Sequence, residues 1–178
     1  MIKSIMRRFK EVTEEILFCL RRMPMLEYEK KLKDYMINNS VAADHLHFDK
    51  ICHSVQEAAD AAGATPDDLV KNICMVDDKG NLIVAIVKGE DRVSTSRVGK
   101  ALKIERPRIA TEDEILEKSG FPCGGVPSFG YEATFIVDPK VIEKEYIYTG
   151  GGSEYSLVRI KSEILTKVNS GLTMRVRK

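Results

Sequence analysis

Three short stretches of this sequence carry residue types that could support a reaction. Lys71-Asn72 lies between the apolar runs "DLV" and "NICMV", the loop "GFPCGGVPSFG" spans Gly120–Gly130, and "GGGS" spans Gly150–Ser153. Glycine accepts positive φ and leaves backbone N–H groups uncovered, so each loop is either a tight turn or a ligand cradle. A single lysine is usually a solvated charge, but one between two apolar stretches is expected to project from a strand end into a concavity. These stretches form the candidate site.

Several common catalytic patterns are absent from the sequence. No G-x-x-x-x-G-K-[ST] phosphate loop occurs, and no G-x-G-x-x-G lies between a strand and a helix near the start, which disfavours an ATPase or a dinucleotide enzyme. Serine catalysis would need a turn such as G-x-S-x-G with a histidine downstream, whereas all three histidines precede residue 54.

Two other chemistries stay open as alternatives. His45 and His47 fall on one face of an expected strand and Cys52-His53 follows nearby, so these residues could bind a metal, although no H-x-x-x-H pair supports this. Cys123 in the first glycine loop could be a nucleophile, but a lone cysteine is more often a small buried hydrophobe. We therefore expect no metal and no cofactor.

Composition and charge describe an ordinary globular chain. It has 178 residues, of which 43% are hydrophobic and 31% charged, which suits one domain with an accessory segment. No apolar run approaches the roughly 20 residues that a membrane helix requires. There is no signal-peptide core and no C-x-x-C among the four cysteines, so we expect a reduced, cytoplasmic protein. The formal net charge of +1 argues against a general nucleic-acid coat protein but is compatible with contact to one end of an RNA.

The hydrophobic periodicity and turn residues predict a single α+β domain with a mixed sheet, because helices and strands are interspersed without a strict βαβ rhythm. Ser54 and Glu57 form a capping box that starts a short helix, which Gly63 ends. Thr65 and Pro66 start another helix. The expected helices cover 26–39, 54–63, 65–70, 94–103, 111–120 and 161–168, and the expected strands cover 41–48, 72–76, 82–87, 133–138 and 156–160.

The N-terminal stretch predicts a separate amphipathic helix. Its apolar residues recur at a 3.6 period from Ile2 to Leu20, and Pro24 should stop the helix, which divides the chain into an accessory helix at 1–24 and a domain at 25–178. Six Lys/Arg against three Glu give this helix a local charge of +3. Packing on the core is the favoured role, and contact with RNA phosphates or assembly of a homo-oligomer are the alternatives.

Lys71-Asn72 before an apolar strand, then "GFPCGGVPSFG", then "YTGGGS" before "LVRI", resembles the YbaK/ProX aminoacyl-tRNA deacylase family, also called prolyl-tRNA-synthetase-associated editing domains. The resemblance covers roughly 26–168, with the motifs in order and at compatible spacings. The glycines of the first loop match. Ser128 departs from the pattern, because family members often have proline there and this chain has Pro127 one place earlier. This departure puts the local geometry of the loop, and with it the substrate selectivity, in question.

The resemblance implies hydrolysis of the ester between a wrong amino acid and the terminal ribose of a tRNA, typically that for proline. This ester is already activated, so fixed backbone N–H groups that stabilise the oxyanion can supply roughly 10²–10³ in rate while water or a ribose hydroxyl attacks. The implied catalytic residues are Lys71, as anchor of the terminal phosphate or ribose, and Gly124 and Gly125, as amide donors to the ester carbonyl. The implied substrate-binding residues are Phe48, Asn72, Ser128, Gly130, Gly151, Gly152 and Ser153.

The implied partner is the acceptor end of an aminoacyl-tRNA, and a synthetase is a second candidate partner. A small pocket would accept alanine, cysteine or serine and exclude the correct amino acid. The same groove could instead belong to a module that binds tRNA or a synthetase without turnover. This binding module is the alternative function.

Overall fold

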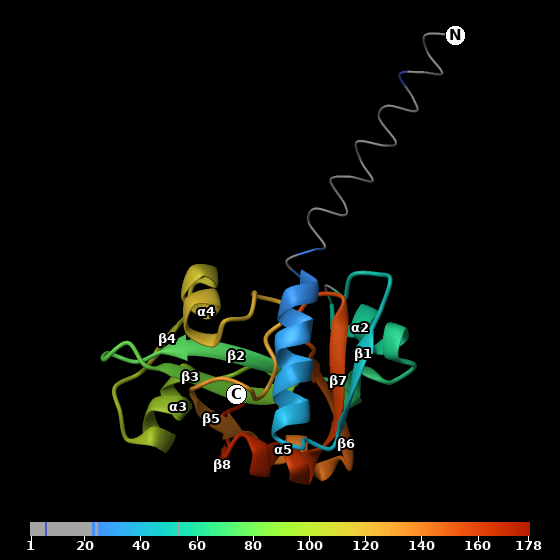
Figure 1. The fold of residues 1–178 in the computed structure, drawn as a ribbon. Coiled ribbons are helices and arrows are strands. Elements are labelled where there is room, and N and C mark those ends of the chain that lie inside the picture. The colour runs from blue at the N-terminus through green and yellow to red at the C-terminus, as the bar shows by residue number, and fades with distance from the viewer. Residues whose placement is uncertain (1–5, 7–22, 24, 53) are drawn as a thin grey trace.

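The computed structural model describes residues 6, 23, 25–52 and 54–178. These residues form the α+β domain that the sequence predicts (Figure 1). The predicted accessory helix and its break at Pro24 lie outside the described residues apart from positions 6 and 23. The division of the chain at residue 24 therefore stays a prediction.

The strands form two sheets that meet at one bridge. A three-stranded antiparallel sheet has the order β1-β7-β6, and a mixed five-stranded sheet has the order β4-β2-β3-β5-β8, in which β5 runs parallel to β3 and β8. An isolated parallel bridge between Leu69 and Tyr148 joins β2 to β6. The strands are β1 (Ala43–His47), β2 (Val70–Val76), β3 (Leu82–Lys88), β4 (Arg108–Ile109), β5 (Thr134–Val137), β6 (Tyr146–Gly150), β7 (Ser156–Lys161) and β8 (Leu172–Thr173).

The helices begin and end where the local signals place them. Ser54 and Glu57 form the predicted capping box, and Gly63 ends that helix in the left-handed conformation with φ 62°. A second capping box lies at Thr111 and Glu114. The helices are a first one at 25–38, α2 (Val55–Ala62), α3 (Thr95–Leu102), α4 (Glu112–Ser119) and α5 (Ser162–Val168).

The structure differs from the prediction in three short segments. The stretch "TPDDLV" forms only the 3₁₀ turn η1 (Pro66–Asp68), because the Asp68 carboxyl group accepts hydrogen bonds from the backbone and hydroxyl of Thr65 and β2 already begins at Val70. The two-residue strands β4 and β8 were not predicted, because two residues are too few to show a period. Residues 139–150, which received no assignment, form the 3₁₀ turn η2 (Pro139–Glu143) and β6.

The apolar side chains form three clusters around the sheets. Helix 25–38 contributes Leu32 and Met36 to the largest cluster, which also receives side chains from α4, α5 and both sheets. Val98 of α3 packs on the opposite face of the five-stranded sheet, and Ala59 of α2 packs on the three-stranded sheet. Figure 1 shows α2 and α3 at different ends of the molecule. The junction between the sheets lies between these two ends.

Candidate functional site

A cavity of about 300 Å³ lies at the junction of the two sheets. Its walls come from α2, the first half of β2, the loop after α4 and the end of β6. Most of its lining is apolar, and the polar side chains that border it include Lys71 and Asn72. Gly124 and Gly150 contribute backbone to the same cavity. Each of the three stretches chosen from the sequence thus lines one cavity, at the lower end of the size range of ligand sites.

Lys71 borders this cavity on the part of β2 that does not pair with β4 and that lies next to the bridge to β6. β2 pairs with β3 from Val70 to Val76, whereas β4 covers only Met75 and Val76. Lys71 is half-buried, and within the described part of the chain its ammonium group makes no hydrogen bond or ion pair. A lysine without an internal counter-charge at the rim of a cavity is available to an anionic or hydroxyl-bearing ligand. The structure thus places this side chain at the concavity that the sequence predicts.

The side chain of Asn72 fastens the first glycine loop to the sheets. Its amide nitrogen donates to the carbonyl oxygen of Val126 at 2.8 Å and to the hydroxyl of Thr149 at 2.9 Å. Its amide oxygen accepts from the Ser128 hydroxyl at 2.6 Å, and that hydroxyl also lies 2.6 Å from the Thr149 hydroxyl. Ser128 and Thr149 are fully buried. Because every polar atom of the Asn72 amide group is engaged, this polar cluster sets the position of the loop.

Ser128, where family members often have proline, holds the loop through its hydrogen bonds. A proline at position 128 could not donate the hydrogen bond that the hydroxyl makes to Asn72. The carbonyl oxygen of Ser128 in addition accepts from the Asn169 side chain at 3.1 Å. The loop is therefore held from two sides by side-chain hydrogen bonds at the position where a rigid ring is expected.

The backbone of the first glycine loop offers one amide that is already engaged and one that is open. The N–H of Gly125 donates to the carbonyl oxygen of Pro122 at 3.0 Å, which closes a turn. Gly124 has φ 87° and lines the cavity, and its N–H donates to no described residue. A Cβ at position 124 would meet nothing within 4 Å. The positive φ explains the glycine at 124, and the amide of this residue is the available donor of the pair.

Gly125 is required by the close approach of the two glycine loops. Its carbonyl oxygen accepts from the N–H of Gly152 at 2.8 Å. A Cβ on Gly125 would lie 2.6 Å from the backbone of Ser153, and one on Gly150 would lie 2.2 Å from the carbonyl oxygen of Val126. Such distances leave no room for a side chain. The two loops therefore form one wall made of backbone.

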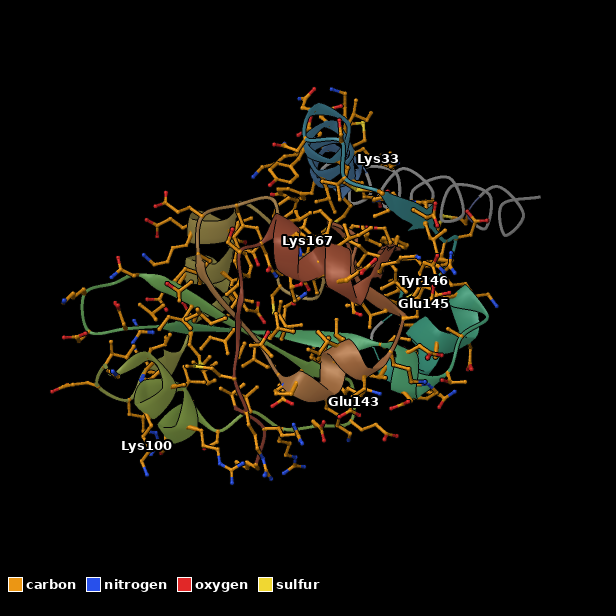
Figure 2. All side chains as sticks on the ribbon, turned by 90° about the horizontal axis from the view of Figure 1, so that it is seen from below. Lys33, Lys100, Glu143, Glu145, Tyr146 and Lys167 are labelled. Carbon is orange, nitrogen blue, oxygen red and sulfur yellow. The ribbon has the colours of Figure 1, made fainter. Side chains whose placement is uncertain are left out.

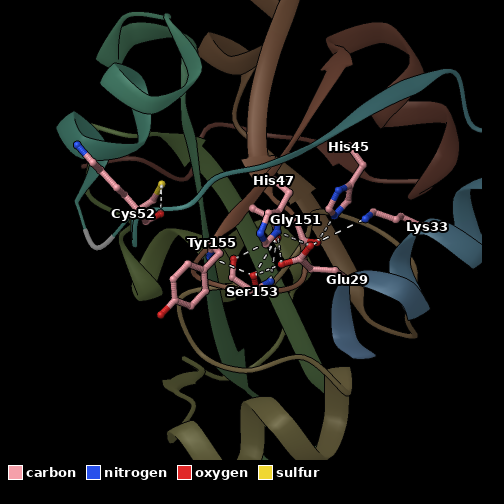
Figure 3. A network of polar contacts seen from close by, with 10 residues as sticks. Glu29, Lys33, His45, His47, Cys52, Gly151, Ser153 and Tyr155 are labelled. Carbon is pink, nitrogen blue, oxygen red and sulfur yellow. Dashed lines mark hydrogen bonds and ion pairs between the residues drawn. The ribbon is translucent and has the colours of Figure 1, made fainter. Parts of the chain in front are cut away.

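Behind this wall the second glycine loop contacts a polar network around a buried carboxyl group (Figure 3). The Glu29 side chain is 1% exposed and accepts from the Ser153 hydroxyl at 2.6 Å. His47 lies 2.9 Å from the same carboxyl group through Nδ1, and Lys33 completes an ion pair at 4.0 Å. The sequence analysis missed Glu29, although it lies three residues before Leu32 on the stripe that helix 25–38 buries.

His45 belongs to the same side of β1 as His47, as the two-residue spacing predicts (Figure 3). Its Nε2 lies 2.7 Å from the carbonyl oxygen of Gly151, so this nitrogen carries the proton. Nδ1 is buried and finds no hydrogen-bond partner among the described residues. Burial lowers the pKa of His45, with Lys33 contributing in the same direction. The neutral ring is the form that this position favours.

Two further predicted site residues, Phe48 and Gly130, lie outside the lining of the cavity. Phe48 packs beside α2 against the cluster whose members line the cavity, and Gly130 lies with φ 95° against Leu32 and Tyr35. Neither of them lines the cavity itself. Their contact with a substrate, like that of Ser128 and the second glycine loop, stays a prediction.

The described cysteines are free thiols. Cys74 lines the cavity, and burial raises the pKa of its thiol to about 12, so it stays protonated. Burial also raises the pKa of Cys52. Cys123 is exposed at the cavity. Within the described residues, no group of three His, Cys, Asp or Glu lies close enough together to hold a metal, and His53 lies outside them.

The fold and the cavity define a class of domain. An α+β domain in which a lysine at the start of a strand and two glycine loops border one cavity has the arrangement of a YbaK/ProX-type domain. The chain belongs to the aminoacyl-tRNA editing domain family, whose family model matches residues 49–168.

The relatives of the chain include prolyl-tRNA synthetases and small solved domains. It is 31% identical over 92 residues to the proline–tRNA ligase of Kosmotoga olearia and 25% identical over 101 residues to that of Thermotoga maritima. These matches cover 48% and 57% of this chain but only 16% and 17% of the ligases. Two solved structures share the fold. A candidate trans-editing enzyme for prolyl tRNA synthetase has a TM-score of 0.79 and 21% sequence identity, and the match covers 85% of this chain and 97% of that one. Hypothetical protein APE2540 has a TM-score of 0.77 and 23% identity, and the match covers 83% of this chain and 99% of that one.

No described helix is long and apolar enough to cross a membrane. The expectation of a cytoplasmic location rests on the sequence alone.

Proposed function

We propose that this chain hydrolyses the ester bond between a mischarged amino acid and the terminal ribose of a tRNA, with tRNA for proline as the substrate. The observation that carries the proposal is the convergence of Lys71, Gly124 and an apolar pocket on one cavity, in a chain of the editing-domain family. The family relationship supports the reaction class. The similarity to prolyl-tRNA synthetases supports the choice of tRNA.

The proposed chemistry needs an oxyanion donor rather than a strong nucleophile. As water or a ribose hydroxyl attacks, the ester carbonyl oxygen gains negative charge, and the open N–H of Gly124 stabilises it. One such donor is worth roughly 10²–10³ in rate. Because the N–H of Gly125 is taken by Pro122, we assign Gly125 to the positioning of the loop. When water attacks, its oxygen forms the new bond to the carbonyl carbon, the bond to the ribose oxygen breaks, and a proton from the water passes to that ribose oxygen, which releases the free amino acid. Attack by the neighbouring ribose hydroxyl only moves the ester to that hydroxyl, so water must still cleave the new ester to complete hydrolysis.

Lys71 anchors the nucleotide end of the substrate in this proposal. Its ammonium group at the rim, which pairs with no described residue, binds the terminal phosphate or the ribose, while the amino-acid side chain enters the apolar part of the cavity beside α2. A cavity of about 300 Å³ favours a small side chain such as that of alanine, cysteine or serine. A synthetase partner would supply mischarged tRNA to this site.

Deacylation assays test the proposal. We would charge tRNA for proline with alanine, cysteine, serine or proline and compare wild type with Lys71→Ala and Lys79→Ala. Lys79 is an exposed lysine in the turn between β2 and β3, at the other end of β2 from Lys71, and does not line the cavity. Loss of a charged hydrogen bond of roughly 1.5–3 kcal/mol predicts a fall of about 10- to 100-fold in kcat/KM for Lys71→Ala. Lys79→Ala should match wild type.

A further variant addresses the alternative nucleophile. Cys123→Ala should retain the wild-type rate, because no covalent step at this thiol is part of the proposal. A rate that vanishes in Cys123→Ala would transfer the reaction to a thioester mechanism. If none of the four amino acids is released while tRNA still binds, the chain is a binding module.

A further inference from the structure

Positive charge is concentrated on one surface of the molecule, which we call the α3 surface and define as the exposed basic side chains of 92–106 and 175–178. These two segments contain eight Lys/Arg and a single carboxylate side chain, Glu105, in a chain whose formal net charge is +1. The rest of the chain is therefore net acidic. The exposed basic members of the surface are Arg92, Arg97, Lys100, Lys103, Arg106, Arg175 and Lys178.

The fold brings the two segments together from distant parts of the sequence. Val93 forms an antiparallel bridge with Arg177, and the N–H of Lys178 donates to the carbonyl oxygen of Arg92 at 2.8 Å. The guanidinium group of Arg97 donates to the carbonyl oxygen of Arg177. Figure 1 shows the C-terminus close to α3, and Lys100 points outward from this helix in Figure 2.

The chain after α3 folds back onto the helix and adds Arg106 to the same surface. The N–H of Ile104 donates to the carbonyl oxygen of Gly99 at 3.0 Å, and a Cβ on Gly99 would lie 3.2 Å from the Cα of Arg106. The guanidinium group of Arg106 donates to the Thr95 hydroxyl at 2.6 Å. Basic side chains thus lie on and beside the solvent-facing side of α3, and backbone hydrogen bonds hold the segments that carry them.

The exposed cations of the α3 surface are not engaged in ion pairs within the described part of the chain. None of the seven forms an ion pair with any described residue, whereas Lys30, Arg108 and Lys144 elsewhere on the molecule each pair with a carboxylate. Close cations that are not neutralised repel one another, and their summed potential attracts a polyanion. This charge pattern fits a ligand with regularly spaced negative charges.

We propose that the α3 surface binds the phosphate backbone of the stem of the substrate RNA, an inference that rests on the proposed deacylase function. Lys and Arg side chains on a helix and on the adjacent C-terminal segment give sequence-independent phosphate contacts. The apolar side of α3 faces the core through Val98, Ala101 and Leu102, so the helix has no exposed apolar side to insert into a lipid surface. Ile73 packs in the same cluster as α3 and also lines the cavity, so β2 connects the docking surface to the reaction site.

Binding of an uncharged RNA tests the surface without the reaction. The probe is an RNA stem-loop with a single-stranded 3′ end, titrated at several salt concentrations. The test variant is Arg92→Gln/Lys100→Gln/Arg175→Gln. The matched control is Lys30→Gln/Lys79→Gln/Lys167→Gln, which removes the same charge from exposed lysines outside the α3 surface.

The proposal predicts a difference in salt dependence. Each lost phosphate contact reduces the slope of log K against log[salt] by roughly 0.9, so the test variant should have a slope about 2.7 less steep than wild type and bind at least about tenfold more weakly at 0.1 M salt. The control should keep the wild-type slope. Equal slopes for the two variants would overturn the proposal. A wild-type slope near zero would also overturn it, and that result does not depend on how either variant folds.

Two further measurements distinguish RNA binding by the α3 surface from the deacylase function and from membrane binding. Hydrolysis of an aminoacyl ester of adenosine, which has no stem, tests the deacylase function alone and should be unchanged in the test variant. Failure of wild type to hydrolyse this ester, with the RNA result intact, would reject the deacylase and retain the docking surface. Binding to vesicles of phosphatidylserine and phosphatidylcholine that depends on the α3 surface, without an effect on RNA, would reassign the surface to a membrane.

Discussion

The role of Asn72 can be decided by a double-mutant cycle with Ser128. The sequence assigns Asn72 to substrate binding, whereas its side chain donates to Val126 and Thr149 and accepts from Ser128. A residue that fixes the loop must contribute to stability as well as to activity. A residue that only contacts substrate contributes to activity alone.

The expected magnitudes follow from the hydrogen bonds. Asn72→Ala removes three, each worth roughly 0.5–1.5 kcal/mol, and leaves the carbonyl oxygen of Val126 without its donor, so we expect a destabilisation of about 2–4 kcal/mol. Ser128→Ala should cost about 1–2 kcal/mol. Because the two side chains share a 2.6 Å hydrogen bond, the double variant should be about 1 kcal/mol more stable than the sum of the single effects.

Denaturant unfolding and ester hydrolysis should be measured on the same four proteins. Asn81→Ala provides the matched control, because the Asn81 side chain donates to Asp77 in an exposed turn and its loss should cost under about 1 kcal/mol. Hydrolysis should fall in Asn72→Ala and Ser128→Ala together, because both release the loop that carries Gly124. Additive stabilities, or an Asn72→Ala protein as stable as wild type that no longer hydrolyses the ester, would refute the positional role and restore substrate contact.

Three further predictions concern stability. Gly125→Ala places a methyl group 2.6 Å from the backbone of the opposing loop and should lower Tm by more than Gly63→Ala, where φ is 62° and the space is open. Thermal melts of both variants measure this, and equal losses would contradict the packing argument. The pKa of His45 is lowered in the folded protein, so its contribution to stability should be full above about pH 6.5 and be lost as the pH falls from there through the folded pKa. Thermal melts recorded between pH 8 and 5 should therefore show a smaller change of Tm with pH in His45→Gln than in wild type. Thr65 and Lys144 lower the pKa of Asp68 to about 2, so its carboxylate stabilises the folded protein above its ordinary pKa and this contribution is lost between about pH 4 and 2. In an acid titration of stability, Asp68→Asn should lack the decrease that wild type shows over that range.

Local signals in the sequence predicted the helices after residue 25 except at 65–70, which forms only the 3₁₀ turn η1. Ser54, Glu57 and Gly63 act on neighbours within a few residues, so the helix they bound could be read without knowledge of the fold. The strands at 72–76 and 82–87 were found with an error of one or two residues at their ends. Pairing determined those ends, since Val70 and Lys88 extend the ladder to the junction with the other sheet.

The candidate site was only partly accessible from the sequence. Its glycines and lysine were found, but Thr149, which binds Asn72, has no local pattern that distinguishes it from other threonines in strands. Glu29 was missed although its place on the buried stripe of helix 25–38 was visible. The separation of the strands into two sheets depends on contacts between distant segments. No periodicity within a single strand carries that information.

The unequal walls of the cavity constrain how its selectivity can evolve. On one side the two glycine loops touch backbone to backbone, so no side chain fits at Gly125 or Gly150, and a substitution of either displaces the wall as a whole. On the other side Val55 and Ala58 of α2 present side chains that a single substitution can lengthen or shorten. Under the proposed function, a change in the accepted amino acid is therefore to be sought on α2, while the glycine wall would keep the proposed reaction the same in all such variants.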